Sequence, residues 1–370
     1  MKETSMRVLV YGMVGTNRGG IETFLLNMNE HMSDGCVFDY VIEEETCIHE
    51  DRVFQKGGKL FRIAPRKTHP MKNAIDSWRL MKSAAASNMP VYFNLSSLSW
   101  IVPVVEARLL KLDVFVHAHN SELIDCNSGF FYKLANSISR CIIKKMRIHR
   151  LTCSDLAASF MFGDEKNVLM IHNAIDLQKF RFNEEARNNI RKKLNIYNDI
   201  VVGFVGRIAY EKNPSFLLDI ADSLSKQTEK NWTVVLLGDG PLRESFERQV
   251  RESNFKSHFL LLGNVPNPND YMQAFDVLCL PSRHEGLPYV LVEAQASGLR
   301  CLVSDRITRV AAVTDLVSYL PVGQDSELWA DAILKLEDRN RSVFLDTMSE
   351  TRFNIDIEAP RLEGILRSSW

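Results

Sequence analysis

Short apolar runs alternate with amphipathic stretches along nearly the whole chain. The first run, MRVLVYG at residues 6–12, is followed by a helical pattern over 20–32 and then by VFDYVI at 37–42. Apolar runs of this length predict buried strands, and a repeat of about 3.6 residues predicts the helices that cover them. The alternation is typical of a parallel α/β sheet. Further strand-like runs are PVYFNL, LDVFVHAH, HRLTCS and KNVLMIHN.

The same alternation starts again after a polar, charged segment near residues 174–198. We therefore predict an α/β protein of two doubly wound, Rossmann-like domains, 1–175 and 176–350, that face an interdomain cleft. Residues 351–370 predict a closing helix after Pro360, which we expect to return to the first domain. Ligands of such sheets bind beyond the carboxyl ends of the strands. The strand-like runs of the second domain are IVVGFVGR, WTVVLLGDG, HFLLLGNV, DVLCLPS and RCLVSD.

Composition narrows the class of protein. A length of 370 residues fits two domains better than one, because single cores seldom grow beyond about 250 to 300 residues. With a formal net charge of -1, the protein as a whole does not attract nucleic acid electrostatically. Its seven cysteines are scattered and lack a metal-binding spacing, which indicates reduced thiols in a cytoplasmic protein. We expect no signal peptide and no membrane span, because the first apolar run is a strand and the stretch 98–118 is interrupted by charges.

The segment SRHEGLPYVLVEAQASG, residues 282–298, predicts a helix over 288–297. Proline is favoured at a helix start, and Gly298 stands where helices commonly end. The positive end of this helix, with N–H groups near Gly286 and Leu287, would lie just beyond the preceding strand. Such a terminus binds anions, so we expect a phosphate there.

Two glutamates, Glu285 and Glu293, flank the start of this helix. Eight helical positions would separate them by about 12 Å, more than the roughly 5 to 9.5 Å between the paired acids of glycoside hydrolases. Carboxylates instead accept hydrogen bonds from hydroxyls, as the acidic residue of dinucleotide-binding folds does for a ribose. A nucleotide sugar, with phosphates in the middle and a hydroxylated ring at each end, fits both observations.

Two cations follow the first strand of the second domain, Arg207 directly and Lys212 five residues later. Arg grips phosphate oxygens bidentately and Lys adds a compact charge, so the pair suits a leaving diphosphate. A solvated surface pair is the alternative. The position after a strand, with Gly203 and Gly206 clearing space, favours the phosphate site.

These segments resemble the family 4 glycosyltransferases, which are retaining enzymes with the GT-B fold. The resemblance rests on GRIAYEKN, the E-x7-E of EGLPYVLVE, the glycine pair of TNRGGIETF and HNAID, and it covers nearly the whole chain. The branch that the chain resembles most makes exopolysaccharides and capsules, through VHAHNSE, TCSDLAASFMFG and SDRITRVAAVTDLVSYL.

The resemblance implies that the second domain binds a nucleotide-diphosphate sugar, with a UDP-sugar favoured. Arg207 and Lys212 would hold the diphosphate, Glu285 would contact the sugar and Glu293 would bind the ribose. The other implied contacts come from the backbone around Gly286, Leu287 and Pro288 for sugar and phosphates, and around Asn264 and Val265 for the base.

The first domain is implied to lie on the acceptor side. Gly19 and Gly20 open its first helix and would bring the backbone close to the diphosphate or the acceptor. His119 would touch the transferred sugar; His117 is the second choice, and a satisfied histidine beneath the loop is the alternative. Asn173, where the chain crosses between domains, shapes the crossing rather than the chemistry.

The implied mechanism is transfer with retention of configuration. No D-x-D metal motif occurs at a strand end, and Arg207, Lys212 and helix termini would stabilise the leaving diphosphate. We therefore expect no metal ion and no cofactor other than the nucleotide-sugar co-substrate. Arg207, Lys212, His119 and Glu285 are the expected catalytic residues, and no residue is identified as a base.

The segment SRCIIKKMRIHR, residues 139–150, gathers five cations in an apolar frame. A helix with this composition either rests on anionic lipid headgroups or presents an ordinary solvated face, and the sequence favours neither interpretation. We expect a saccharide or lipid-linked saccharide acceptor, peripheral contact with the inner face of the cytoplasmic membrane, and no nucleic acid.

Two other functions remain open. A nucleotide-sugar epimerase of similar fold would release free sugar or epimerised donor, and a catalytically silent nucleotide-sugar-binding subunit would bind without turnover. A dinucleotide oxidoreductase fits poorly, because GMVGTNRGG departs from G-x-G-x-x-G.

Overall fold

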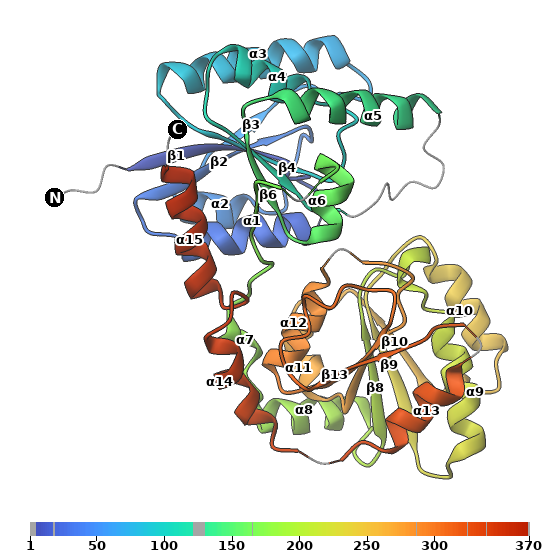
Figure 1. Ribbon diagram of the computed structural model, residues 1–370. Coiled ribbons are helices and arrows are strands. Elements are labelled where there is room, and N and C mark those ends of the chain that lie inside the picture. The colour runs from blue at the N-terminus through green and yellow to red at the C-terminus, as the bar shows by residue number, and fades with distance from the viewer. Residues whose placement is uncertain are drawn as a thin grey trace. The chain divides into compact units, whose positions relative to one another are not determined.

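The computed structural model describes residues 5–17, 19–120, 130–164, 166–285, 287–323, 325–337 and 339–368. It contains two compact units (Figure 1): unit 1 combines Met1–Ala174 with Ile355–Trp370, and unit 2 is Ile175–Asn354. The predicted boundaries at 175/176 and 350/351 lie one and four residues from these.

Unit 1 contains a seven-stranded parallel sheet of order β3-β2-β1-β4-β5-β6-β7. The predicted apolar runs all form strands of this sheet, so the parallel α/β class is confirmed. The additional strand β3 is short and only half-buried, so it lacks a strong apolar pattern. The strands are β1 Met6–Tyr11, β2 Cys36–Ile42, β3 Leu60–Arg62, β4 Val91–Leu95, β5 Val114–Ala118, β6 His149–Thr152 and β7 Val168–Met170.

Helices cover both faces of this sheet, with α3, α4 and α5 on one face and α1 and α2 on the other (Figure 1). Fully buried aromatic side chains, among them Phe24, Tyr40, Tyr92 and Phe115, fill the space between the layers. The helices are α1 Gly20–His31, α2 Glu50–Gln55, α3 Pro70–Ala86, α4 Val102–Leu109, α5 Phe130–Lys145, α6 Asp155–Phe162 and α15 Ile355–Arg367.

The last helix, α15, starts five residues before Pro360, so the expectation of a helix only after that proline is wrong. Proline removes one backbone donor from the helix, but Ile355, Ala359 and Leu362 are fully buried and their packing keeps the helix continuous. Polar contacts add to this packing, since Glu363 accepts from both the N–H and the Oγ of Ser33 at 2.8 and 2.7 Å.

A second polar contact ties α15 to the segment after β7. Glu358 accepts from the His172 N–H at 2.9 Å and from Arg361 at 2.8 Å. Burial alone would raise the pKa of the Glu358 carboxyl, but these bonds outweigh it and lower the pKa below its usual value.

Unit 2 contains a six-stranded parallel sheet of order β10-β9-β8-β11-β12-β13. Five of its strands follow the predicted runs, and the sixth, β13, was not predicted because it is half-exposed. The strands are β8 Ile200–Val205, β9 Trp232–Leu237, β10 Phe259–Gly263, β11 Val277–Leu280, β12 Arg300–Ser304 and β13 Val317–Leu320.

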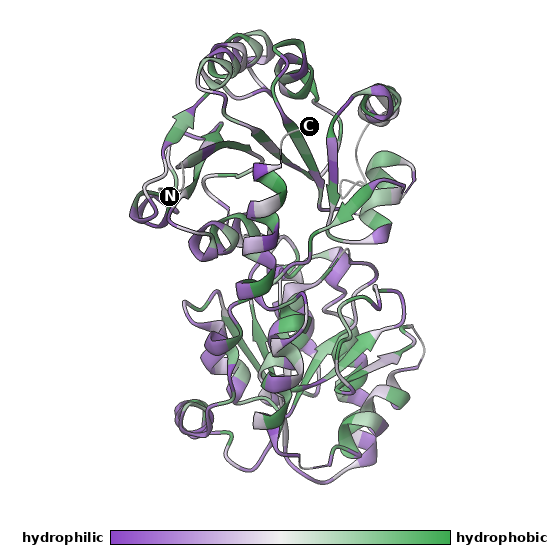
Figure 2. Ribbon diagram, turned by 60° about the vertical axis from the view of Figure 1, so that its left-hand side comes forward, coloured by the Kyte–Doolittle hydropathy of each residue, from purple (hydrophilic) through white to green (hydrophobic). Residues whose placement is uncertain are grey.

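The helices of unit 2 also lie on both faces of its sheet, with α8, α11 and α12 on one face and α9, α10 and α13 on the other (Figure 1). Figure 2 shows the hydrophobic residues concentrated in the strands and on the helix faces toward them. The helices are α7 Leu177–Phe180, α8 Glu184–Leu194, α9 Phe216–Gln227, α10 Arg243–Glu252, α11 Pro268–Gln273, α12 Tyr289–Ala296, α13 Ser326–Leu334 and α14 Phe344–Ser349, with short 3-10 turns at Tyr210–Lys212, Lys256–His258 and Arg341–Val343.

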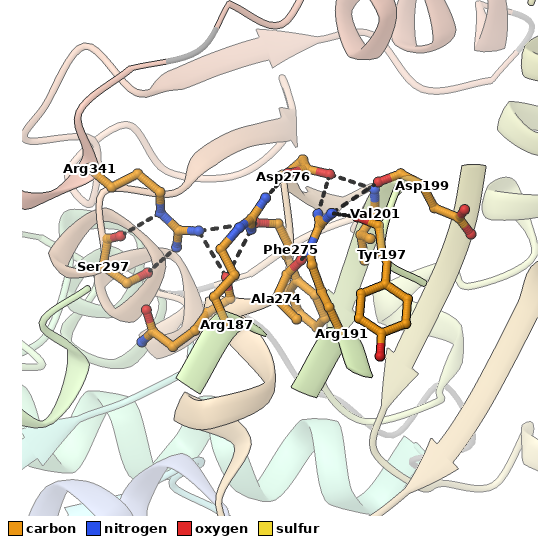
Figure 3. Close-up of polar contacts among 11 residues, drawn as sticks. Arg187, Arg191, Tyr197, Asp199, Val201, Ala274, Phe275, Asp276, Ser297 and Arg341 are labelled. Atoms are coloured by element: carbon orange, nitrogen blue, oxygen red, sulfur yellow. Dashed lines mark hydrogen bonds and ion pairs between the residues drawn. The ribbon is translucent and has the colours of Figure 1, made fainter. Parts of the chain in front are cut away.

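Asp276 joins β8 to β11 (Figure 3). The ladder between these two strands contains only two residue pairs. Its backbone N–H donates to the carbonyl of Val201 at 2.9 Å, and its Oδ2 accepts from the Val201 N–H at 2.8 Å. Arg187 and Arg191 of α8 donate to the same carboxylate at 2.5 and 2.6 Å. One carboxylate therefore fixes two strands and one helix to each other.

Arg341 completes this cluster without a carboxylate of its own. It donates to the carbonyls of Gln273, Phe275 and Ser297 at 3.1, 3.1 and 2.9 Å (Figure 3). These include carbonyls at the end of α11, where the helix dipole favours a cation. Burial lowers the pKa of Arg341 to about 9.

Every helix in the described ranges is too short or too polar to cross a lipid bilayer.

We predict that Asp276→Asn lowers the free energy of unfolding by about 2–4 kcal/mol, because the guanidinium groups of Arg187 and Arg191 then lose the carboxylate that they share. Chemical denaturation measures this change. The matched control is Asp222→Asn, which removes an exposed ion pair with Lys226 on α9 and should leave stability nearly unchanged. Equal effects of the two substitutions would contradict the central role of Asp276.

Candidate functional site

The direction of the chain reverses across the unit 2 sheet between β8 and β11. These strands are neighbours, yet β8 leads to β9 on one side and β11 leads to β12 on the other. The loops after such a pair diverge and leave room for a ligand at the carboxyl edge. Here the loops are 206–215 and 281–288, and both were selected from the sequence.

Lys212 and Glu285 meet between these loops. Lys212 Nζ donates to Glu285 Oε2 at 2.5 Å, and Ser282 Oγ donates to Glu285 Oε1 at 2.6 Å. The Glu285 side chain is only 8% exposed. Because a carboxylate has about four lone-pair directions, it can still accept from a ligand hydroxyl. Two predicted residues are thus brought together, with Ser282 as a partner that the sequence analysis missed.

Asn213 ties the two loops to each other. Its Nδ2 donates to the carbonyl of Pro281 at 3.1 Å, and its Oδ1 accepts from Arg283 at 2.8 Å. Its backbone is left-handed, with φ of +53°, a conformation that Asn adopts more readily than most residues. The Asn directly after Lys212 was therefore a readable signal that the sequence analysis did not use.

Glycines let the loops after β8 and β9 approach closely. A Cβ on Gly238 would lie 2.0 Å from the carbonyl oxygen of Gly206, and the two residues have φ of +134° and +155°. Arg207, next in the chain, is exposed, and it makes no hydrogen bond or ion pair with any residue that the structure describes. The carboxyl edge therefore presents two cations: Lys212, which is bonded to the Glu285 carboxylate, and Arg207, which is accessible to an anion.

Glu293 lies on α12, inside unit 2. The carboxyl keeps some exposure, but the surrounding protein removes most of its water and raises its pKa to about 7. In the part of the chain that the structure describes, nothing donates a hydrogen bond to it. A ligand with hydroxyl donors would stabilise the ionised form.

The start of α12 follows the prediction closely. Pro288 is the N-cap, and its side chain cannot accept a hydrogen bond from the first turn. Leu287 is buried, and Gly286 lies outside the described residues. Asn264 and Val265 follow β10, which is separated from β8 by β9.

The loop before α1 in unit 1 is organised by Glu22. This buried carboxylate accepts from the N–H groups of Val14 and Gly19, both at 3.0 Å. The N–H of Gly19 is therefore already paired, and only the remaining N–H groups of the first turn, beginning with Gly20, are left for a ligand. A Glu three residues after the cap is typical of a helix start, so Glu22 could have been selected from the sequence, but it was not.

His119 follows β5, and its Nε2 lies 2.8 Å from Asn94 Oδ1. His117, inside β5, bonds instead to the Tyr92 hydroxyl at 2.6 Å and is completely buried, whereas His119 is 9% exposed. Burial lowers the pKa of His119 to about 3 and that of His117 well below its usual value. Both rings are uncharged at neutral pH, so His119 cannot supply a proton as an imidazolium.

Asn173 is buried at the end of unit 1, next to His172. The chain passes into unit 2 two residues later, where Ile175 donates to the carbonyl of Phe353 at 2.9 Å. Asn173 therefore lies directly before the point where the chain passes from unit 1 into unit 2. Throughout the described ranges, His, Cys, Asp and Glu side chains do not gather in threes as metal ligands.

Known proteins resemble this chain over most of its length. The family model of group 1 glycosyl transferases matches residues 186–350. EpsF of Bacillus subtilis, a predicted glycosyltransferase, is 33% identical over 380 residues, which cover 99% of this chain and 96% of EpsF. A UDP-Gal:α-D-GlcNAc-diphosphoundecaprenol α-1,3-galactosyltransferase of Escherichia coli is 27% identical over 246 residues, 64% of this chain and 62% of its own.

Solved structures share the fold. HepE of Anabaena in complex with UDP matches with a TM-score of 0.80 at 16% identity, covering 98% of this chain and 100% of HepE. WaaG, a glycosyltransferase involved in lipopolysaccharide biosynthesis, matches with a TM-score of 0.72 at 14% identity, covering 98% of this chain and 100% of WaaG. These structures confirm the predicted GT-B fold.

The raised pKa of Glu293 predicts a pH-dependent stability. The folded protein holds this proton more tightly than the unfolded chain, whose carboxyl has a pKa near 4.5. Its contribution is therefore most favourable below about pH 4.5 and is lost as the pH rises through about 7. Glu293→Gln should exceed the wild type by about 2–3 kcal/mol in unfolding free energy near pH 8 and match it near pH 4.5.

Urea unfolding at several pH values measures this difference. Glu229→Gln, at an exposed carboxylate of the same unit, is the control and should show no such pH trend. A Glu293→Gln difference that does not change with pH would show that the carboxyl titrates normally.

Proposed function

The chain belongs to the group 1 glycosyltransferases, and on that premise we propose that it moves a sugar from a UDP-sugar to a polysaccharide or lipid-linked saccharide in surface polysaccharide synthesis. The observation that carries the proposal is the contact of Lys212 with Glu285 between the diverging loops, beside the exposed Arg207. The E. coli relative, named for UDP-Gal and a diphosphoundecaprenol-linked acceptor, supports this choice of substrates, as does HepE, solved with UDP and with UDP-glucose.

In this proposal the donor lies at the carboxyl edge of unit 2. Arg207 and Lys212 bind its diphosphate, and Glu285, held by Ser282, accepts from a sugar hydroxyl. Glu293 accepts from the ribose hydroxyls, which would explain an otherwise costly carboxylate in a dry position. The backbone around Gly286, Leu287 and Pro288 serves the sugar and phosphates, and that around Asn264 and Val265 serves the base.

The chemistry follows from charge. As the sugar leaves the donor, negative charge grows on the diphosphate, where Arg207, Lys212 and the N-terminus of α12 stabilise it. We infer that transfer therefore needs no divalent ion and no further cofactor. It proceeds with retention, the acceptor approaching from the face that the diphosphate leaves. His119 takes part as an uncharged hydrogen-bonding group.

Two other functions use the same residues. An epimerase would convert or release the donor sugar without an acceptor, and a silent subunit would bind the donor without turnover. Product analysis with and without saccharide acceptors separates these from transfer.

The basic segment 139–150 covers the end of a helix and the start of a strand: α5 ends at Lys145, and the predicted strand HRLTCS begins as β6 at His149. A strand follows because Leu151 and Thr152 are buried in the sheet. α5 nevertheless exposes apolar side chains beside cations. The exposed apolar residues are Leu134, Ile138 and Ile142, with Leu109 on α4, and the exposed cations are Lys144, Lys145 and Arg147.

We propose that this surface rests on the anionic cytoplasmic face of a membrane, where a lipid-linked acceptor would be found. Exposed apolar side chains enter the headgroup region, and each cation near the surface contributes about 1 kcal/mol.

Donor binding tests the site. With EDTA present, Lys212→Ala and Arg207→Ala should each weaken UDP affinity about tenfold or more, since each removes a charge-assisted bond worth about 1.5–3 kcal/mol. Calorimetric titration measures the affinity, and Lys226→Ala, at an exposed lysine of α9, should leave it unchanged. Wild-type binding that requires a metal ion would refute the metal-free site, and unchanged affinity in both variants would refute the assignment.

Vesicle binding tests the surface. Ile138→Glu and Lys145→Glu should each reduce sedimentation with phosphatidylglycerol vesicles several-fold, and binding should fall with added salt. Ile75→Glu replaces an equally exposed isoleucine on α3 and serves as the control. If all three variants sediment alike, α5 does not meet the membrane.

A further inference from the structure

Two histidines of unit 1 are each hydrogen-bonded to a residue of the neighbouring strand, and the two bonded pairs lie two residues apart along the chain. Tyr92 bonds to His117, and two residues further along both strands Asn94 bonds to His119. Because side chains of a strand alternate between its faces, the paired residues share one face. Phe24 of α1 covers both rings, with centroid distances of 5.0 and 5.2 Å.

The Asn94 pair stands at the carboxyl edge of unit 1, where β1 and β4 are neighbours whose following strands lie on opposite sides. Gly12, directly after β1, is pressed against Asn94, since a Cβ there would lie 1.9 Å from the Asn94 carbonyl oxygen. Three strand ends, those of β1, β4 and β5, therefore meet at this residue. This is the edge at which doubly wound sheets bind ligands.

The side chain of Asn94 is only half satisfied. It is 1% exposed, its Oδ1 faces His119 Nε2, and its Nδ2 is buried with no hydrogen-bond partner among the described residues. An unpaired buried donor costs about 1–3 kcal/mol, so an apolar residue of this size would be the better choice for packing alone. The amide is explained if its oxygen is needed by His119.

An amide oxygen can only accept, so His119 must carry its proton on Nε2. Its Nδ1 then bears a lone pair, and the described part of the chain gives Nδ1 no partner. Burial keeps the ring uncharged, with a pKa of about 3. Such a ring offers a fixed acceptor to a hydroxyl.

We propose that Asn94 is a positioning residue: it fixes His119 as the Nε2–H tautomer, so that Nδ1 accepts a hydrogen bond from a hydroxyl of the transferred sugar. This role rests on the proposed function, because it assumes a sugar ligand. Asn94 itself makes no bond to the sugar, and it acts through the orientation and tautomer of the ring.

The tautomer is tested on the unliganded protein. Long-range proton–nitrogen NMR with labelled histidine, assigned by loss of one signal in His119→Gln, should show Nε2–H for the wild type. Asn94→Ala should give a mixture of tautomers. A wild-type Nδ1–H tautomer, or an unchanged one in Asn94→Ala, would overturn the proposal whether or not any donor binds.

The effect on the sugar is measured by comparing UDP with the tightest binder among UDP-glucose, UDP-galactose and UDP-N-acetylglucosamine. Asn94→Ala should reduce the preference for the UDP-sugar over UDP by about fivefold to tenfold, the loss of one hydrogen bond, and leave UDP affinity unchanged. Tyr92→Phe is the matched control, because it removes the neighbouring histidine bond. It should lower the melting temperature and leave the preference intact.

Asn94→Asp keeps the acceptor oxygen and adds a charge that raises the pKa of His119. This variant should regain the preference at high pH and lose it at low pH, where the ring is protonated, whereas the wild type shows no such dependence. If Tyr92→Phe reduces the preference as much as Asn94→Ala, Asn94 is only structural. If the wild type binds neither UDP nor a UDP-sugar, the proposed function fails and the sugar role fails with it, while the NMR result still stands.

Discussion

The short junction between β8 and β11 is the constraint on which the rest of unit 2 depends. Only two residue pairs join these strands, so Asp276 and its arginines determine how closely they lie. The two loops that leave them in opposite directions carry Lys212 and Glu285. The contact between Lys212 and Glu285 at the carboxyl edge of the sheet therefore depends on Asp276, which fixes the same two strands at their amino ends.

Unit 1 repeats this geometry between β1 and β4 with a different result. At the start of α1, the Glu22 carboxylate accepts from the N–H of the cap residue Gly19, so an acidic side chain already lies at this helix terminus. At the start of α12 the cap is a proline, whose side chain cannot accept a hydrogen bond. Of these two helix starts, both reached through glycine-containing loops, the one in unit 2 is better suited to an anion, and unit 1 instead offers uncharged groups at Asn94 and His119.

Sequence patterns predicted the two parallel sheets and the segments around Lys212 and Glu285, because apolar runs and strand-end positions are local properties. They did not predict β3 or β13, which are too exposed to leave an apolar signature, or the helical turns before Pro360, which depend on buried contacts of Ile355 and Ala359. The partners of the site residues were also missed. Ser282 and Asn213 act through bonds to side chains or carbonyls that only folding brings near, and the 25-residue separation of Asn94 and His119 has no pattern of its own.

The helix α15 makes unit 1 discontinuous, since all of unit 2 lies between its two parts. During synthesis, unit 2 leaves the ribosome before α15 does, so it can close its own core first. All strands of the unit 1 sheet have been synthesised by then, but the surface beside Ser33 and the segment after β7 stay uncovered until α15 is synthesised. The protein therefore completes its first unit last, and chaperones that bind apolar surface would find it during that interval.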